Sequence, residues 1–389
     1  MSLKYYKDFT EPTGSNNVQL SLAYNGNVYA VTSQPRIRLY DQATFENTKV
    51  SQSITSGAQG ITLITSASAV MCHNSASVTY VELSSLHTTS VTSGAAAAPS
   101  SGLNQLAAGN PTSGIAILAR STSGGVIKAT SSQVLTALTP AALTGTTATA
   151  IVVKDSNWII GTANGKVMEM DSSGTVSTNI TLPATPAIAA QTIQVTGLVY
   201  YNDRLLVLTD LGLMFLYQWS TSTLLDTQFT SPTTAYSFSC LTDLASGSAA
   251  ASWNGSTSAP LSEIYFDAGK IVFEDTIYIP GTIKSLTCDP TTNFVGMGGT
   301  SSSFTSYFSA KSSKTDRIQV STRLQDPAGL DIEGRVIRLR KSKIGSSIVE
   351  SDTTTTIGSQ LINATNSRSY IEIAVRTSPE KFDVREFDA

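Results

Sequence analysis

The segment 148–182, ATAIVVKDSNWIIGTANGKVMEMDSSGTVSTNITL, contains the pattern that decides the fold. Four runs rich in apolar and β-branched residues are separated by short polar turns at 155–157, 164–165 and 173–174. Such runs bounded by Asn, Asp, Gly and Ser predict β-strands. Asn164-Gly165 suits a two-residue hairpin, because both central positions of that turn need a positive φ angle. The segment is therefore predicted to form four consecutive antiparallel strands.

The same series of strands and turns recurs along the chain. The first strand of each unit is predicted to begin near Val18, Ile61, Leu103, Ala148, Ile193, Tyr236 and Ile283. Successive units therefore start about 42 to 47 residues apart, a period typical of four-stranded β-propeller blades. We expect an all-β protein with a seven-bladed β-propeller over residues 1–311. Six or eight blades remain alternatives, because Ser- and Ala-rich stretches blur the second and third units.

The last unit shows only three clear strands, over 283–288, 294–298 and 304–308. Residues 3–9 precede the first unit and supply a candidate for the missing outer strand. Closing the ring with this N-terminal strand would remove an exposed sheet edge. The strand layout resembles that of WD40-like and quinoprotein-like propellers. The Gly-His and Trp-Asp signatures of WD40 repeats are missing, and three tryptophans are too few for the docking pattern of quinoproteins.

The composition excludes several classes of function. Charged residues make up 14% of the chain and the net charge is −3, so the predicted propeller has no basic stripe for nucleic acid. A single basic run comprises Arg335, Arg338, Arg340, Lys341 and Lys343. Its residues mostly alternate along an expected strand, which favours a solvated face over an anion site. The start of the chain lacks an apolar signal-peptide core, and no apolar run is long enough to span a membrane.

The chain after Lys311 differs from the repeats. It contains Gly-Arg-Val-Ile-Arg-Leu-Arg-Lys at 334–341, Ser-x-x-Gly at 342–345 and Tyr-Ile-Glu-Ile-Ala-Val at 370–375. This order resembles the small transthyretin-like (carboxypeptidase regulatory-like) module that ends many tailed-bacteriophage virion proteins. The family's Asp-x-x-Gly before its third strand is matched only in part by 353–358. The resemblance implies a β-sandwich over 312–389 and a protein of the virion or tail.

No catalytic constellation stands out. The two histidines are His73 and His87, and His73 is next to Cys72. Neighbours in a strand point to opposite faces, so these two should not form a catalytic dyad. The cysteines (Cys72, Cys240, Cys288) are too few and too far apart for a zinc site or a disulfide framework. We expect each of them to be a small core residue in a strand.

Paired carboxylates and aromatic platforms are the remaining candidates. The acidic pairs are Glu169 with Asp171, Asp203 with Asp210, and Glu274 with Asp275. Acids in such turns commonly bind backbone N–H groups, and we prefer that role to glycosidase chemistry. Trp158, Trp219 and Trp253 occupy similar places in successive units, where packing between blades is preferred to a sugar-stacking site. The cluster Gly296–Gly299 is expected to be a turn or bulge, since no helix follows it.

These observations predict no catalytic, cofactor-binding or metal-binding residues. We expect a non-enzymatic structural or binding component of a phage virion, associated with the tail in assembly, as an adaptor or in host attachment. Its partners would be other virion proteins or a host surface receptor, and the chain would form a homo-oligomer. It would be made in the host cytoplasm, bind no nucleic acid and not insert into a membrane. The alternative is a propeller that binds or cleaves glycans, and a cellular scaffold is a third hypothesis.

Overall fold

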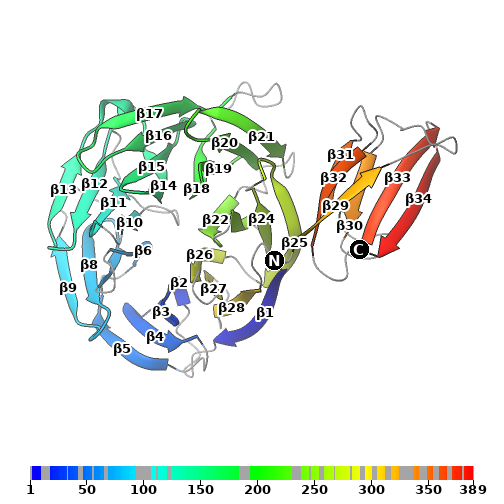
Figure 1. Ribbon diagram of the computed structural model, residues 1–389. Coiled ribbons are helices and arrows are strands. Elements are labelled where there is room, and N and C mark those ends of the chain that lie inside the picture. The colour runs from blue at the N-terminus through cyan, green and yellow to red at the C-terminus, as the bar shows by residue number, and fades with distance from the viewer. Residues whose placement is uncertain are drawn as a thin grey trace.

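The computed structural model confirms an all-β protein with a β-propeller. It describes residues 2–9, 18–32, 34–42, 47–54, 57–64, 69–92, 107–110, 113–120, 124–183, 193–229, 238–244, 247–253, 258–266, 268–280, 283–289, 294–299, 305–311, 317–323, 336–340, 348–353, 359–365, 370–378 and 381–388. The propeller sheets are antiparallel and stand around a ring, with the first strand of each sheet innermost and the fourth outermost (Figure 1). Within the described residues, no helix is long and apolar enough to cross a membrane.

Six sheets are each built from four strands consecutive in sequence. The first two are β2 (Val18–Tyr24), β3 (Asn27–Thr32), β4 (Arg36–Asp41), β5 (Asn47–Ser53), and β6 (Gly60–Leu63), β7 (Ala69–His73), β8 (Ser77–Glu82), β9 (Thr88–Thr92). The next two are β10 (Ala107–Asn110), β11 (Ile115–Ala119), β12 (Val126–Thr130), β13 (Leu135–Leu138), and β14 (Ala148–Lys154), β15 (Asn157–Thr162), β16 (Lys166–Met170), β17 (Val176–Thr181). The last two are β18 (Val195–Tyr201), β19 (Arg204–Thr209), β20 (Leu213–Gln218), β21 (Thr223–Phe229), and β22 (Phe238–Asp243), β23 (Ser248–Trp253), β24 (Ser258–Tyr265), β25 (Val272–Pro280). A short 3-10 helix, η2 (Ala141–Leu143), precedes β14.

One further four-stranded sheet combines the two ends of this region. Its strands are β26 (Ile283–Asp289), β27 (Phe294–Gly299), β28 (Thr305–Lys311) and the N-terminal β1 (Ser2–Phe9). β1 pairs with β28 in antiparallel register, with Ser2 opposite Lys311 and Phe9 opposite Thr305. The glycine cluster 296–299 lies inside β27 and pairs with β26, so it is not a turn. The pairing shifts by one residue opposite Gly298 and Gly299, which agrees with the other expectation, a bulge. Glycine is depleted in strands but not excluded from them, and it permits close approach of a neighbouring backbone.

The innermost strands share a local irregularity. In β2, β14, β18, β22 and β26 the pairing with the second strand shifts by one residue near the start of the strand. Such a bulge bends the strand and increases its twist. Small polar side chains then connect neighbouring innermost strands: Thr149 Oγ1 donates to the Val195 carbonyl at 2.6 Å, and the Gly109 N–H donates to Thr62 Oγ1 at 3.0 Å. These bonds join the sheets close to the ring's centre.

The hydrophobic core lies between neighbouring sheets. Between β14–β17 and β18–β21 it includes Ile159, Leu205 and Phe215, all fully buried. Similar clusters fill the spaces on either side, with Trp158 in one and Phe266 in another. The second to fifth sheets are thus covered on both faces, which explains why their central strands contain nearly continuous apolar runs.

The strands after β28 form two further antiparallel sheets, one of two strands and one of four. One pairs β29 (Arg317–Arg323) with β32 (Ser359–Thr365). The other has the order β31 (Ile348–Thr353), β30 (Val336–Arg340), β33 (Tyr370–Ser378), β34 (Lys381–Asp388). Two of the predicted basic-run residues, Arg338 and Arg340, fall on β30, whereas Arg335, Lys341 and Lys343 lie outside the described residues.

Candidate functional site

The described turns between first and second strands, β2–β3, β14–β15 and β18–β19, occupy equivalent places in their sheets and so emerge on one side of the ring. Because strands alternate in direction, the turns between third and fourth strands emerge on the same side, which we call the first-turn face. Asp155-Ser156 closes the hairpin between β14 and β15, and Asn202-Asp203 closes the one between β18 and β19. Asp155, Asn202 and Asp203 have φ angles of 51°, 46° and 62°. Asn and Asp tolerate this left-handed conformation, so the sequence encodes tight and rigid turns here.

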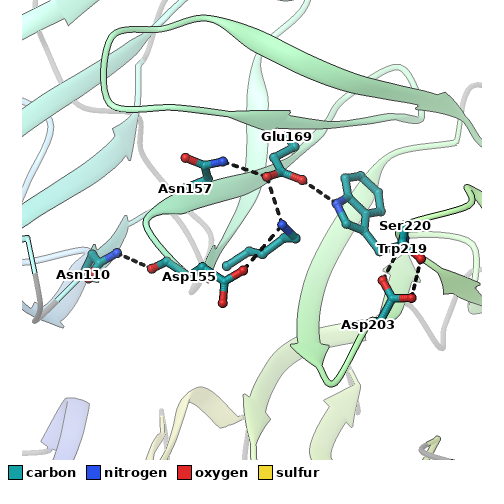
Figure 2. Close-up of polar contacts among 8 residues, drawn as sticks. Asn110, Asp155, Asn157, Glu169, Asp203, Trp219 and Ser220 are labelled. Carbon is teal, nitrogen blue, oxygen red and sulfur yellow. Dashed lines mark hydrogen bonds and ion pairs between the residues drawn. The ribbon is translucent and has the colours of Figure 1, made fainter.

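A buried carboxylate, Glu169 on β16, organises the polar contacts beneath these turns (Figure 2). Its Oε1 accepts hydrogen bonds from Asn157 Nδ2 at 2.7 Å and Lys154 Nζ at 3.1 Å. Its Oε2 accepts a bond of 2.7 Å from Nε1 of Trp219, which follows β20 in the next sheet. Only 7% of Glu169 is exposed. One carboxylate therefore joins three strands of the fourth sheet, β14, β15 and β16, to the residue that follows β20 in the fifth.

The charges of this cluster are fixed by their partners. Burial acts to raise the pKa of Glu169, but hydrogen bonds from Asn157, Trp219 and Lys154 prevail and lower it. Burial acts to lower the pKa of Lys154, but the hydrogen bond and charge of Glu169 prevail and raise it. The ammonium of Lys154 also lies 5.8 Å from the centre of the Tyr200 ring. Both groups are therefore ionised at neutral pH, and neither is poised to transfer a proton.

A second set of bonds holds the neighbouring turns. Asp203 accepts from the backbone N–H of Ser220 at 2.7 Å and from its hydroxyl, and these bonds lower its pKa against the effect of burial. The Asn110 side chain donates to the carbonyl of Asp155 at 2.7 Å and so connects the third sheet to the fourth. Side chains at the turn tips, including Ser156 and Ser220, remain exposed. The result is a rigid polar surface spanning several sheets.

Within the described residues, the candidate acids Asp171, Asp203 and Asp210 lie in or beside turns. Asp203 and Asp210 lie beyond opposite ends of β19, roughly 23 Å apart along an extended strand, whereas glycosidase carboxylates lie about 5–9.5 Å apart. Asp171 binds the backbone N–H groups of Ser173 and Thr175 at 2.8 and 2.9 Å, the turn role that the sequence favours. Glu274 and Asp275 lie on β25, and their side chains are outside the described residues. Among the described residues, no three His, Cys, Asp or Glu side chains are grouped to hold a metal ion.

The tryptophans pack between sheets. Trp158 is fully buried, and its Nε1 donates to the Ala108 carbonyl of the preceding sheet at 2.9 Å. Trp219 is 2% exposed and bonds Glu169 as described above. Neither ring can stack on a sugar from solution, which favours the packing role predicted for them. The Trp253 side chain lies outside the described residues.

The histidine beside Cys72 is fully buried. Burial lowers the pKa of His73 to about 4, although the backbone of Asn74 acts to raise it. Burial also raises the pKa of the Cys72 thiol to about 12. Neither ring nitrogen of His73 has a hydrogen-bond partner among the described residues. A neutral imidazole next to a protonated thiol is not an activated nucleophile. His87, by contrast, is exposed in the turn that follows β8.

Sequence reasoning missed most members of the polar cluster. It selected Glu169, Asp203 and Trp219 but assigned no part to Lys154, Asn157 or Ser220. Lys154 and Asn157 flank the predicted turn, so hairpin pairing alone places them side by side. The contact with Trp219 depends on how two sheets pack, for which the sequence carries no comparable signal.

Comparison with known proteins identifies the class of fold. No family model and no curated protein matches the chain. Among solved structures, the Cps50 (Swd1) β-propeller domain of Myceliophteria thermophila aligns with a TM-score of 0.62 and 11% identity, covering 80% of this chain and all of that one. The WD40 propeller domain of Doa1 gives 0.61 and 12% over 80% of this chain and 97% of its own, and the RRP9 WD40 repeats give 0.59 and 10% over 78% and 100%. At these identities the likeness shows a β-propeller fold.

These matches overturn the predicted identification as a tailed-phage virion protein. The similar structures are WD40 propeller domains, and the alignment covers most of the chain. Three further predictions depended on that identification and are withdrawn with it. They are the virion location, the virion and host-receptor partners, and the tail or attachment role. The resemblance rested on alternating strands and turn spacing within 334–385. Small antiparallel modules share those features whatever their origin, so the pattern was not specific.

Proposed function

We propose that this protein is a non-enzymatic interaction scaffold whose propeller presents its first-turn face to a protein partner. The observation that carries the proposal is the polar cluster around Glu169. Its charged groups are occupied by structural bonds, while the turns they support remain rigid and exposed. Preorganised turns bind with little loss of conformational freedom. The similarity to WD40 domains, including one from Doa1, supports a scaffold in preference to an enzyme.

The experiment compares two matched surface substitutions. Ser156 is exposed on the first-turn face, and Ser75 is exposed in the β7–β8 turn on the opposite face. Partners are captured from the source cells with the purified chain and a crosslinker, identified by mass spectrometry and purified. Their affinity for the wild type, Ser156→Arg and Ser75→Arg is then measured by calorimetry. We expect Ser156→Arg to weaken binding at least about tenfold, because a bulky cation at an interface centre leaves contacts unmade.

Either of two results would contradict the proposal. The first is equal binding by Ser156→Arg and the wild type, with Ser75→Arg impaired. The second is turnover of a substrate that is lost on substitution of a first-turn residue. Circular dichroism of each variant verifies that the propeller is intact. The predicted homo-oligomer stays a prediction, which mass determination of the purified chain checks.

We infer that the antiparallel sheet of β26, β27, β28 and β1, which combines strands from the two ends of the propeller region, acts as a seventh blade. Three bonds from β2 to β26 support this: the N–H groups of Ser21, Ala23 and Gly26 donate to Ser285 Oγ, Thr287 Oγ1 and Asp289 Oδ2 at 3.1, 2.9 and 2.8 Å. Such bonds close a ring between its first and last sheets. Deletion of residues 1–9 should then lower the melting temperature by several degrees. No change on deletion would leave six blades as the stable unit.

We also propose that residues 312–389 form a separate β-sandwich module beside the propeller of residues 1–311. The support is the pairing pattern, because among the described strands β29 to β34 pair only with one another. Limited proteolysis should release a stable fragment ending near residue 311. Cleavage at sites spread evenly through the propeller would contradict the division.

A further inference from the structure

A small pocket opens between the second and third propeller sheets on the first-turn face. Its volume is about 290 Å³, at the lower end for ligand sites and enough for one long side chain. It is lined by Ala69, Tyr80, Glu82, His87, Thr89, Ser131 and Gln133. The first five come from β7, β8, β9 and the β8–β9 turn, and the last two from the turn between β12 and β13.

Strand register brings the lining residues of the second sheet to one face. Tyr80 and Glu82 are two residues apart on β8 and therefore point the same way. Ala69 pairs with Glu82 across β7, and Thr89 pairs with Tyr80 across β9. Tyr80 also belongs to the core cluster between the second and third sheets. The part of this face that packs against the third sheet is therefore core, and the part next to the first-turn face forms the wall of the pocket.

Both turns at the rim are held by hydrogen bonds. In the β8–β9 turn, the N–H groups of Leu86 and His87 donate to the Glu82 carbonyl at 2.8 Å and to Ser85 Oγ at 3.0 Å. In the β12–β13 turn, Gln133 has a φ of 65° and donates to the Thr130 carbonyl at 2.9 Å. The pocket is thus preformed and does not depend on mobile loops.

The chemistry of the pocket is that of an acceptor site with a negative charge. Tyr80 is 4% exposed, and its buried hydroxyl has no hydrogen-bond partner among the residues that the structure describes. An unpaired buried hydroxyl is unfavourable and calls for a polar ligand atom. The Glu82 carboxylate accepts a bond from the Ser85 hydroxyl, and among the described residues no Lys or Arg pairs with it. Thr89, Ser131 and Gln133 add further oxygen acceptors.

We propose that this pocket binds an arginine side chain of a protein partner, with Glu82 pairing with the guanidinium and Tyr80 Oη accepting one of its N–H groups. A guanidinium offers five donors in a planar fork, which suits acceptors arriving from several strands. The pocket's size fits a single side chain. This inference rests on the proposed function, because the arginine belongs to a protein docked on the first-turn face.

The test uses Nα-acetyl-L-arginine amide as the probe and its citrulline analogue as a neutral isostere. Binding is followed by the NMR signals of the two histidines, because His87 lines the pocket and His73 is buried elsewhere in the same sheet. The variants are Glu82→Gln, Tyr80→Phe and the matched control Asp171→Asn, which alters an acid in the equivalent turn of the fourth sheet. Asparagine at 171 keeps an oxygen that can accept the turn's N–H bonds.

We expect the arginine probe to shift the His87 signal saturably and leave the His73 signal unchanged. Glu82→Gln should weaken binding about tenfold and Tyr80→Phe about fivefold, whereas Asp171→Asn should not weaken it. Equal binding of the citrulline analogue, or wild-type affinity in Glu82→Gln, would overturn the proposal. Tyr80→Phe removes an unpaired hydroxyl and should fold normally, so it keeps the test valid if Glu82→Gln were unstable.

Failure of this inference can be separated from failure of the proposed function. A captured partner that binds Glu82→Gln as tightly as the wild type, but fails to bind Ser156→Arg, overturns the arginine pocket alone. Glu82-dependent binding of the probe, together with a partner insensitive to Ser156→Arg, supports the pocket and contradicts the wider first-turn interface.

Discussion

Acidification should destabilise this protein through one histidine. His73 is fully buried and its pKa is lowered from 6.5 to about 4. As the pH falls below 6.5, the unfolded chain takes up a proton at this residue that the folded chain does not. The free energy of unfolding therefore decreases, and this loss ends below about pH 4, where the folded state is protonated too. Each pKa unit is worth about 1.4 kcal/mol, so the full effect is about 3 kcal/mol, of which about 2 kcal/mol is lost by pH 5.

The folded-state pKa can be measured directly. The chain has two histidines, so the NMR signals of their ring protons are assigned by comparison with a His87→Gln variant. We expect the His73 signal to stay constant down to pH 5. Urea unfolding of the wild type and His73→Leu at pH 7.5 and 5 then isolates the contribution of this residue from those of the carboxylates. A His73 signal that titrates above about pH 6, or equal pH dependence in the two proteins, would refute the reasoning.

Four substitutions test the packing between sheets. In urea unfolding, Glu169→Gln should lower the free energy of unfolding by about 2 kcal/mol. The double variant with Trp219→Phe should lose less free energy of unfolding than the sum of the two single variants, because the two side chains share a hydrogen bond. Gly109→Ala should cost about 3 kcal/mol in the same assay, because its Cβ would lie 1.7 Å from the Leu63 carbonyl oxygen. Asp289→Ala removes two hydrogen bonds between the first and last sheets. Relative to the wild type, the hydrogen-exchange rate of this variant should rise more at the β2–β3 turn than elsewhere in the described chain.

The repeat made the propeller predictable, because strand runs and turn residues are local features. The turns at 25–26, 155–156 and 202–203 adopt the tight hairpins that their Asn, Asp and Gly residues indicate. The pairing of Glu169 with Lys154 and Trp219 was not predicted, because it depends on the register of one sheet and its contact with the next. The family assignment failed for a related reason, since alternation describes a strand and carries no information about ancestry.

The unusual composition also has a structural explanation. Hydroxyl side chains on innermost strands bond the backbone of the adjacent sheet at three junctions. Thr62 bonds Gly109, Thr149 bonds Val195, and Ser285 and Thr287 bond Ser21 and Ala23. Near the centre of the ring the sheets converge, and small hydroxyl groups can bridge them where long charged side chains would be crowded. Each such bond adds about 1 kcal/mol, and several around a closed ring act together because opening one seam exposes the next. A chain with few charges and many Ser and Thr residues can therefore hold its sheets in register through short, uncharged contacts. Its scarce acidic side chains then serve where two sheets must be tied at the first-turn face, as Glu169 and Asp289 do.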